Sequence, residues 1–415
     1  MSERAAARGG QTRLIILVGA LSAFAPLSID MYLPALPRLA TSLGGAAWQL
    51  QLTITGCLIG LAVGQLVAGP LSDRFGRRRP LLLGVGLYAA ASLGCAAAPS
   101  VPVLVLLRLL QGGSGAAGIV IARAVVRDLH EGPALARFLA LMMVVNGLAP
   151  VLAPVVGAQI LRLGSWRPVF VLLGAIGAAL LAAAAAGLPE TLPPERRHGG
   201  GLGRTLGILA GLLRDRTFAG CALANGLAYA AMFAYIAGSP FVVQDRFGGS
   251  AQLFSAIFAT NACGIMAAGQ LSARLARRLG ARPLLVGGLA VSLSGAGVLA
   301  AAGLTGAGLP AILPGFFLVV ASIGFVSPNA AALALGAHGR EAGSASALLG
   351  LAQFLIGGAA APLAGIGGAR ADGPMIATIA AASLGASLSF ALLAGRRPGP
   401  AAAAGSATAA GAPPP

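Results

Sequence analysis

The chain has 415 residues, of which 57% are hydrophobic and 9% are charged. Soluble domains carry about 25% charged residues, and disordered chains are poorer in apolar ones, so both are excluded and a polytopic membrane protein remains. The formal net charge is +17, but every basic residue is Arg and most lie in short clusters between apolar runs. Such clusters are typical of charges that flank a membrane, so we expect no nucleic-acid partner.

Twelve apolar runs are long enough to cross a lipid bilayer as α-helices, since a span needs about 20 residues and must satisfy its own backbone. They lie at 14–36, 48–69, 80–98, 101–122, 138–161, 168–188, 217–238, 252–273, 283–303, 309–335, 343–367 and 374–394. Arg residues precede the first run, but no small-residue cleavage site follows it, so it is not interpreted as a signal peptide. The sequence predicts an all-α membrane protein of twelve transmembrane helices.

A proline-containing, charged connection near the middle of the chain separates two sets of six runs. We predict an N-terminal six-helix half over 1–188, a cytoplasmic linker over 189–216 and a C-terminal six-helix half over 217–395. The tail over 396–415 consists of Ala, Gly and Pro with few other residues, and we expect it to be disordered.

The Arg residues are distributed unequally between the two sides of the predicted membrane. With the N-terminus inside, 22 Arg fall in inside connections and 5 in outside connections, and Arg108 remains within a span. Inside connections are enriched in basic residues, so both termini are predicted to be cytoplasmic and the lipid partner is the cytoplasmic (inner) membrane.

The segment Gly69-Pro-Leu-Ser-Asp-Arg-Phe-Gly-Arg-Arg-Arg79 resembles the loop between the second and third helices of the major facilitator superfamily. A weaker copy starts at Gly269, as expected of transporter repeats. The resemblance implies that Asp73 accepts hydrogen bonds from the N-terminus of the eleventh helix, near Gly343, and latches the cytoplasmic side. The expected latch residues are Gly69, Asp73, Arg74, Gly76, Arg77 and Asp128.

Further segments are similar to the Bcr/CflA group of drug:proton antiporters within that superfamily. They are Ser28-Ile-Asp-Met-Tyr-Leu-Pro-Ala-Leu-Pro37, Arg108-Leu-Leu-Gln-Gly112, Ala122-Arg-Ala-Val-Val-Arg-Asp128, Ala149-Pro-Val-Leu-Ala-Pro154, Ser239-Pro-Phe241, Ser327-Pro-Asn329 and Gly343-Ser-Ala-Ser-Ala347. The resemblance implies a two-half transporter that exports drugs or toxic small molecules in exchange for protons. The alternative is a proton-coupled exporter of an endogenous metabolite such as a sugar, an amino acid or a siderophore.

Asp30 and Arg108 are the only acidic and the only basic residue within the apolar spans. Charges at membrane depth are costly and are usually functional. Counting residues places Asp30 about 9 Å and Arg108 about 10 Å from the same membrane edge. By resemblance both helices line the central cavity, so we expect the two side chains to be coupled directly or through water and to carry the proton. The alternative is a fixed structural ion pair.

Pro150 and Pro154, with Gly157, resemble the antiporter kink of the fifth helix and are expected to bend it. Polar and aromatic residues of the cavity helices are the candidates for drug binding: Tyr32, Asn146, Asn225, Tyr229, Phe233, Tyr235, Asn261 and Gln353. The alternative for each is contact between helices or anchoring at the membrane interface.

A membrane-bound enzyme is disfavoured because the spans lack a cluster of catalytic acids or metal ligands. The His residues are scattered and the four Cys form no metal-binding pair, so no metal or cofactor is expected. No nucleotide-binding loop is present, and a monomer is expected.

Overall fold

The computed structural model describes residues 17–197, 207, 211–336 and 342–394. Within these ranges the chain is helical and forms no β-strand. Eleven of the described helices are long and apolar enough to span a membrane. The first expected span is broken into shorter pieces and is not among these eleven. The expected disordered tail lies outside the described residues.

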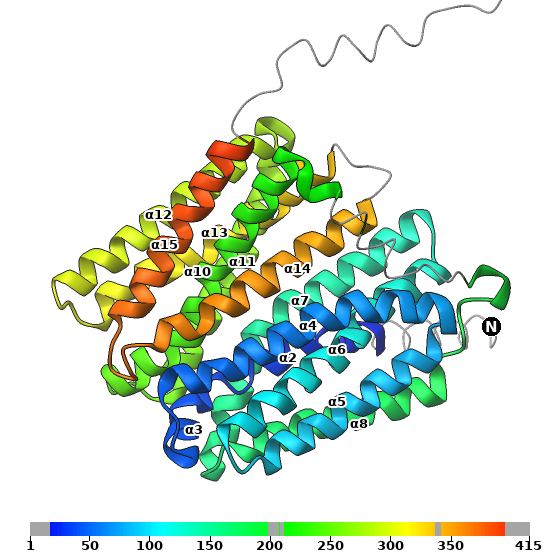
Figure 1. The fold of residues 1–415 in the computed structure, drawn as a ribbon, viewed down its shortest axis with the longest axis horizontal. Coiled ribbons are helices and arrows are strands. Elements are labelled where there is room, and N and C mark those ends of the chain that lie inside the picture. The colour runs from blue at the N-terminus through cyan, green and yellow to red at the C-terminus, as the bar shows by residue number, and fades with distance from the viewer. Residues whose placement is uncertain (1–16, 198–206, 208–210, 337–341, 395–415) are drawn as a thin grey trace, which may run out of the picture.

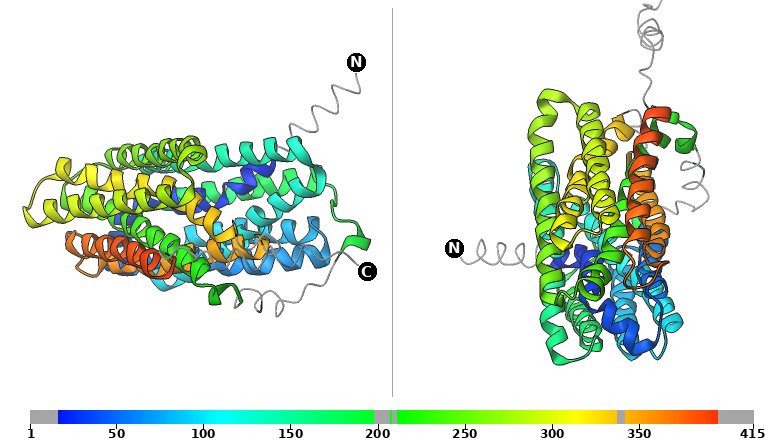
Figure 2. Two further views of the ribbon diagram at one scale, coloured as in Figure 1. Left: turned by 90° about the horizontal axis from the view of Figure 1, so that it is seen from above. Right: turned by 90° about the vertical axis from the view of Figure 1, so that its left-hand side faces the viewer.

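The helices form two groups that follow one another in the sequence. The first group comprises a helix over 17–22, α2 (Phe24–Asp30), η1 (Leu33–Ala35), α3 (Leu36–Leu43), α4 (Ala47–Phe75), α5 (Arg78–Ala97), α6 (Val101–Leu129), α7 (Gly132–Ile160), η2 (Leu161–Leu163) and α8 (Arg167–Gly187). After η3 (Pro194–Arg196), the second group comprises α10 (Arg216–Phe241), η4 (Val242–Arg246), α11 (Ala251–Leu279), α12 (Ala281–Leu304), α13 (Leu309–Gly336), α14 (Ala342–Ala360), η6 (Ala361–Gly365), α15 (Gly373–Ser389) and η7 (Phe390–Ala394). Figures 1 and 2 show the two groups on opposite sides of the bundle.

The helices begin and end close to the expected positions at one end of the bundle and run further at the other. α4, α6 and α11 end at Phe75, Leu129 and Leu279, six or seven residues beyond the expected ends at 69, 122 and 273. The added turns contain Arg and other good helix formers, so the helix continues after the chain leaves the apolar layer. We call this the arginine-rich end.

The first span is interrupted by its prolines. Pro26 has no N–H for the carbonyl of Ser22, and the helix breaks at Ala23 before α2 begins. α2 ends at Asp30, and a short 3₁₀ turn containing Pro34 follows. Asp30 therefore lies at the end of a helical segment in the middle of a membrane pass.

The two halves pack against each other along two pairs of helices. α4 packs against α14, and α7 packs against α11. In Figure 1, α14 runs beside α4 although some 290 residues separate them in the sequence. These pairs leave a space between the halves, which contains the candidate site.

Candidate functional site

A cavity of about 1220 Å³ lies between the two halves. Its wall is formed by the 17–22 helix, α2, α4, α6 and α7 of the first half and by α10, α11, α13 and α14 of the second. It reaches from Asp30 and Tyr235 in the interior to Asp73, Arg127 and Asp128 at the arginine-rich end. The cavity therefore opens at that end.

The opposite end of the cavity is sealed by hydrogen bonds between the halves. Five side chains donate to backbone carbonyls across the interface: Gln51 to Ala237 (3.1 Å), Thr55 to Gly358 (2.7 Å), Gln244 to Pro34 (3.2 Å), Gln252 to Ala158 (3.2 Å) and Ser255 to Pro154 (2.8 Å). All five donors are uncharged. The part of the chain that the structure describes has no such bond between the halves at the arginine-rich end.

Asp30 lines the cavity with a side chain that is almost fully buried. The Asp30 carboxylate forms no hydrogen bond and no ion pair with another described residue. Tyr235 of the opposite half lines the same cavity. The other two carboxylates on the wall, Asp73 and Asp128, lie at the mouth and are paired with Arg77. Asp30 is thus the one interior acid of the described cavity wall.

Arg108 was expected to line the cavity, but it does not. It is completely buried inside the first half, where its guanidinium lies over the Tyr32 ring (4.4 Å to the centroid) and donates to Gln111 and to the Thr53 carbonyl (3.4 Å). Gln111 in turn donates to Ser92 (2.7 Å). No ion pair joins Arg108 to Asp30 in the described chain, so the expected direct contact is not formed in this conformation. The rotation of α6 about its own axis decides this placement.

Seven of the eight residues expected to bind substrate line the cavity: Asn146, Asn225, Tyr229, Phe233, Tyr235, Asn261 and Gln353. Tyr32 does not, because two residues after Asp30 the chain has turned to the opposite side of the segment. Its hydroxyl pairs with Thr53 (3.0 Å) inside the first half. Sequence reasoning missed Gln65 and Phe258, which also line the cavity. The signal for Gln65 was present, as a polar residue within an apolar run.

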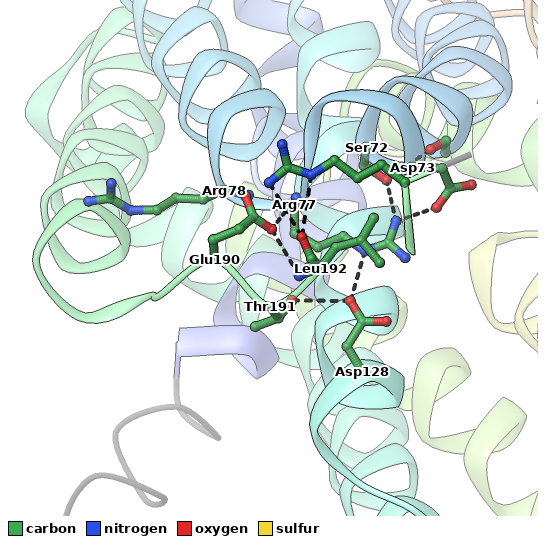
Figure 3. A network of polar contacts seen from close by, with 10 residues as sticks. Ser72, Asp73, Arg77, Arg78, Asp128, Glu190, Thr191 and Leu192 are labelled. Carbon is green, nitrogen blue, oxygen red and sulfur yellow. Dashed lines mark hydrogen bonds and ion pairs between the residues drawn. The ribbon is translucent and has the colours of Figure 1, made fainter. Parts of the chain in front are cut away.

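The loop that ends α4 is organised around Arg77, as Figure 3 shows. Arg77 pairs with Asp73, donates from Nε to Asp128 (2.8 Å) and from Nη1 to Ser72 (2.9 Å). Arg77 therefore joins the ends of α4 and α6. Arg74 does not take part, because its guanidinium lies over the ring of Phe75.

Glu190, which sequence reasoning missed, binds the same loop from the segment after α8 (Figure 3). Its carboxylate accepts hydrogen bonds from the backbone N–H groups of Arg77 (2.7 Å), Arg78 (3.2 Å) and Leu192 (3.0 Å). Partial burial opposes its charge, but these bonds and nearby Arg197 outweigh it and hold the pKa of the Glu190 carboxyl below its usual range. Gly76 makes the approach possible, since its φ is +86° and a Cβ there would lie 2.4 Å from Glu190 Oε2.

The expected latch between Asp73 and the N-terminus of α14 is not formed here. Asp73 is half exposed and bonds to Arg77. Gly343 and Ser344, in the first turn of α14, line the cavity together with Asp73. In this conformation, with the mouth of the cavity open, Asp73 and the first turn of α14 line the same cavity but do not contact each other.

α7 continues through both prolines of the expected kink, from Gly132 to Ile160. Gly157 has a clear reason to be glycine, because a Cβ there would lie 1.8 Å from the Met31 carbonyl oxygen. The close approach of α7 to the break after Asp30 therefore requires a residue without a side chain. Within the described ranges, no three His, Cys, Asp or Glu side chains come together as metal ligands.

Two helical halves around a cavity that is open at one end and sealed at the other are the architecture of membrane carriers, which expose one site to alternate sides. A model of the Major Facilitator Superfamily matches residues 18–362. The chain belongs to the Major Facilitator Superfamily, whose members are membrane transporters.

Similar proteins cover nearly the whole chain. The uncharacterized MFS-type transporter YdgK of Bacillus subtilis (strain 168) is 39% identical over 361 residues, which are 86% of this chain and 90% of that protein. A bicyclomycin resistance protein homolog of Haemophilus influenzae is 32% identical over 350 residues, with 83% and 86% covered. The solved structure of the nucleoside transporter NupG shares the fold with a TM-score of 0.76 at 12% identity, covering 92% of this chain and 99% of that one.

Proposed function

We propose that this transporter exports drugs or toxic small molecules across the cytoplasmic membrane in exchange for protons. It acts as a monomer with both termini and the arginine-rich end in the cytoplasm. The observation that carries the proposal is Asp30, the interior carboxylate of a cavity that aromatic and amide side chains line, with Arg77, Arg123 and Arg127 on its wall toward the arginine-rich end. The similarity to a bicyclomycin resistance protein homolog supports a drug as cargo.

In this proposal Asp30 takes up the proton because its carboxylate lies on the cavity wall. It has no fixed partner among the described residues and it faces the cavity, so a proton or a substrate can reach it. Met31, the next residue, presents its carbonyl to Gly157 of α7, and the Pro34 carbonyl accepts the Gln244 bond of the sealed end. A change of charge at Asp30 therefore acts next to contacts that would have to move for the sealed end to open.

Arg108 has a positioning role in this scheme. Its buried positive charge is held by Tyr32 and Gln111 within the same half as Asp30. Water or a movement of α2 would connect the two groups when the transporter changes state. Asp73, Arg77 and Asp128 would then rearrange to latch the arginine-rich end against α14.

The Asp30→Asn variant tests the proposal. An efflux-deficient strain expressing the chain is challenged with phenicols, bicyclomycin and cationic agents, and membrane abundance is matched by immunoblot. We expect resistance to one compound class, its loss in Asp30→Asn, and substrate-driven proton release from vesicles only with the wild-type chain. Glu195→Gln removes an exposed carboxylate and is expected to transport normally.

Two results would contradict the proposal. Unchanged transport and pH dependence in Asp30→Asn would remove the proton role from this residue. Resistance to no compound at good expression would favour export of an endogenous metabolite instead.

A further inference from the structure

Asn225 is a buried amide on the cavity wall that lacks a hydrogen-bond partner among the described residues. Asn225 lies on α10, is 3% exposed and lines the cavity. Neither end of its amide hydrogen-bonds to a described residue, and its Oδ1 is fully buried without a partner. Buried amides in proteins are almost always hydrogen-bonded, and leaving one unsatisfied is destabilising.

The other asparagines of the cavity wall are satisfied. Asn146 donates to Ser22 (3.1 Å) and to the Met142 carbonyl (2.8 Å). Asn261 donates to the Tyr235 hydroxyl (2.8 Å). Asn225 is therefore the exception among the three asparagines of the described cavity wall.

The position of Asn225 on α10 indicates the chemistry of the missing partner. Tyr229, Met232 and Phe233 follow it on the cavity-facing side of the helix, and none of the cavity-lining residues of α10 is charged. Asn225 lies ten residues before Tyr235, or about 15 Å along the helix axis from the level of Tyr235 and Asp30. An uncharged amide next to an aromatic pair suits a group that both donates and accepts hydrogen bonds and adjoins an apolar surface.

We propose that Asn225 forms a second substrate subsite, which binds an uncharged hydroxyl or amide group of the cargo while an adjoining apolar part packs on Tyr229 and Phe233. The inference rests on the proposed export function and specifies its substrate class. The cargo is a neutral amphipathic molecule rich in hydrogen-bond donors, not a donor-free organic cation. A site built to hydrogen-bond such a group discriminates against compounds that lack it.

The first measurement needs no substrate. Asn225→Leu keeps a branched side chain, although a larger one, and removes the unsatisfied amide, so we expect the purified variant to melt at a higher Tm than the wild type. The matched control, Asn261→Leu, breaks the bond to Tyr235 and is expected to lower Tm. A decrease in Asn225→Leu as large as that of the control would show that Asn225 has a structural partner, and would overturn the proposal.

The second measurement uses two probes, bicyclomycin as a donor-rich neutral compound and tetraphenylphosphonium as a cation without donors. We expect the wild type to bind bicyclomycin and Asn225→Leu to bind it roughly tenfold more weakly, with binding of the cation unchanged. Unchanged bicyclomycin binding in the variant, or wild-type binding of the cation alone, would refute the subsite while leaving drug export intact. If neither probe binds, the proposed export of drugs is contradicted, and the Tm comparison still decides whether Asn225 has a structural partner in the fold.

Discussion

Glu190 illustrates how a single side chain far away in the sequence completes a local structure. The N-terminus of every helix leaves backbone N–H groups without helical partners. At the start of α5, the N–H groups of Arg77 and Arg78 donate to the carboxylate of Glu190, which lies 113 and 112 residues later, respectively. Thr191 next to it donates to Asp128 (3.1 Å), so the segment after α8 is attached to both the α4–α5 loop and α6.

The lowered pKa of Glu190 makes this attachment dependent on pH. A carboxyl whose pKa is lower in the folded state stabilises the fold above its unfolded pKa, and this contribution is lost as the pH falls through the folded value. We expect Glu190→Gln to lower Tm at pH 7, and the difference from wild type to shrink below about pH 4, near the unperturbed Glu value. Thermal melts over a pH series measure this, with Glu195→Gln as the exposed control. A constant difference at all pH values would contradict an ionic role.

At the scale of elements, the sealed end depends on where α14 stops being a regular helix. Pro362 has no N–H, so the Gly358 carbonyl lacks its helical partner and η6 replaces the last turn. Thr55 of α4 donates to this carbonyl across the interface of the halves. A proline in one half thus creates the acceptor that a hydroxyl in the other half uses.

The Thr55→Val variant tests this contact. The net free energy of such a bond is about 0.5–1.5 kcal/mol, so its loss is expected to shift the equilibrium roughly two- to tenfold toward the state with the arginine-rich end closed. Spin labels at Arg79 and Arg278, exposed in the first and second half respectively, would report a larger population at short distance.

Thr260→Val is the matched control for this experiment. The hydroxyl of Thr260 donates to Ala256 within its own helix (2.9 Å) and is exposed, so its loss is expected to leave the label distances unchanged. Equal distance distributions for Thr55→Val and Thr260→Val would show that the Thr55 bond does not hold the sealed end.

At the scale of the whole molecule, the cavity and the Arg distribution indicate the same side of the membrane. The mouth lies at the arginine-rich end, and basic residues mark the cytoplasmic side. In the proposed orientation, the described conformation would admit substrate from the cytoplasm, as the proposed export requires before each cycle.

Cysteine labelling tests this orientation. In a chain without its native cysteines, a membrane-impermeant maleimide is expected to label Gln353→Cys in inside-out vesicles but not in intact cells. Leu304→Cys, at the opposite end of the bundle and 91% exposed, is expected to show the reverse. Labelling of Leu304→Cys from the cytoplasmic side alone would contradict the proposed topology.

The helical passes follow from sequence because they depend on local properties. A span must be apolar along its length and must satisfy its own backbone, so the apolar runs predict the helices without reference to their neighbours. The expected starts at 217 and 252 agree with α10 and α11, which Asp215 and Ser250 cap by accepting backbone N–H bonds. The break in the first pass was also present in the sequence, as Pro26 and Pro34.

Tertiary structure decided which side chains point into the cavity. Asp30 and seven of eight candidates line the cavity, whereas Arg108 and Tyr32 turn inward and stack on each other. The rotation of a helix that is apolar on all sides leaves no period in the sequence from which its inner face can be determined. The roles of Glu190, Thr55 and Asn225 likewise depend on partners, present or missing, from distant segments. Length, hydrophobicity and Arg placement thus determined the passes by themselves, and packing between them decided which residues meet in the cavity.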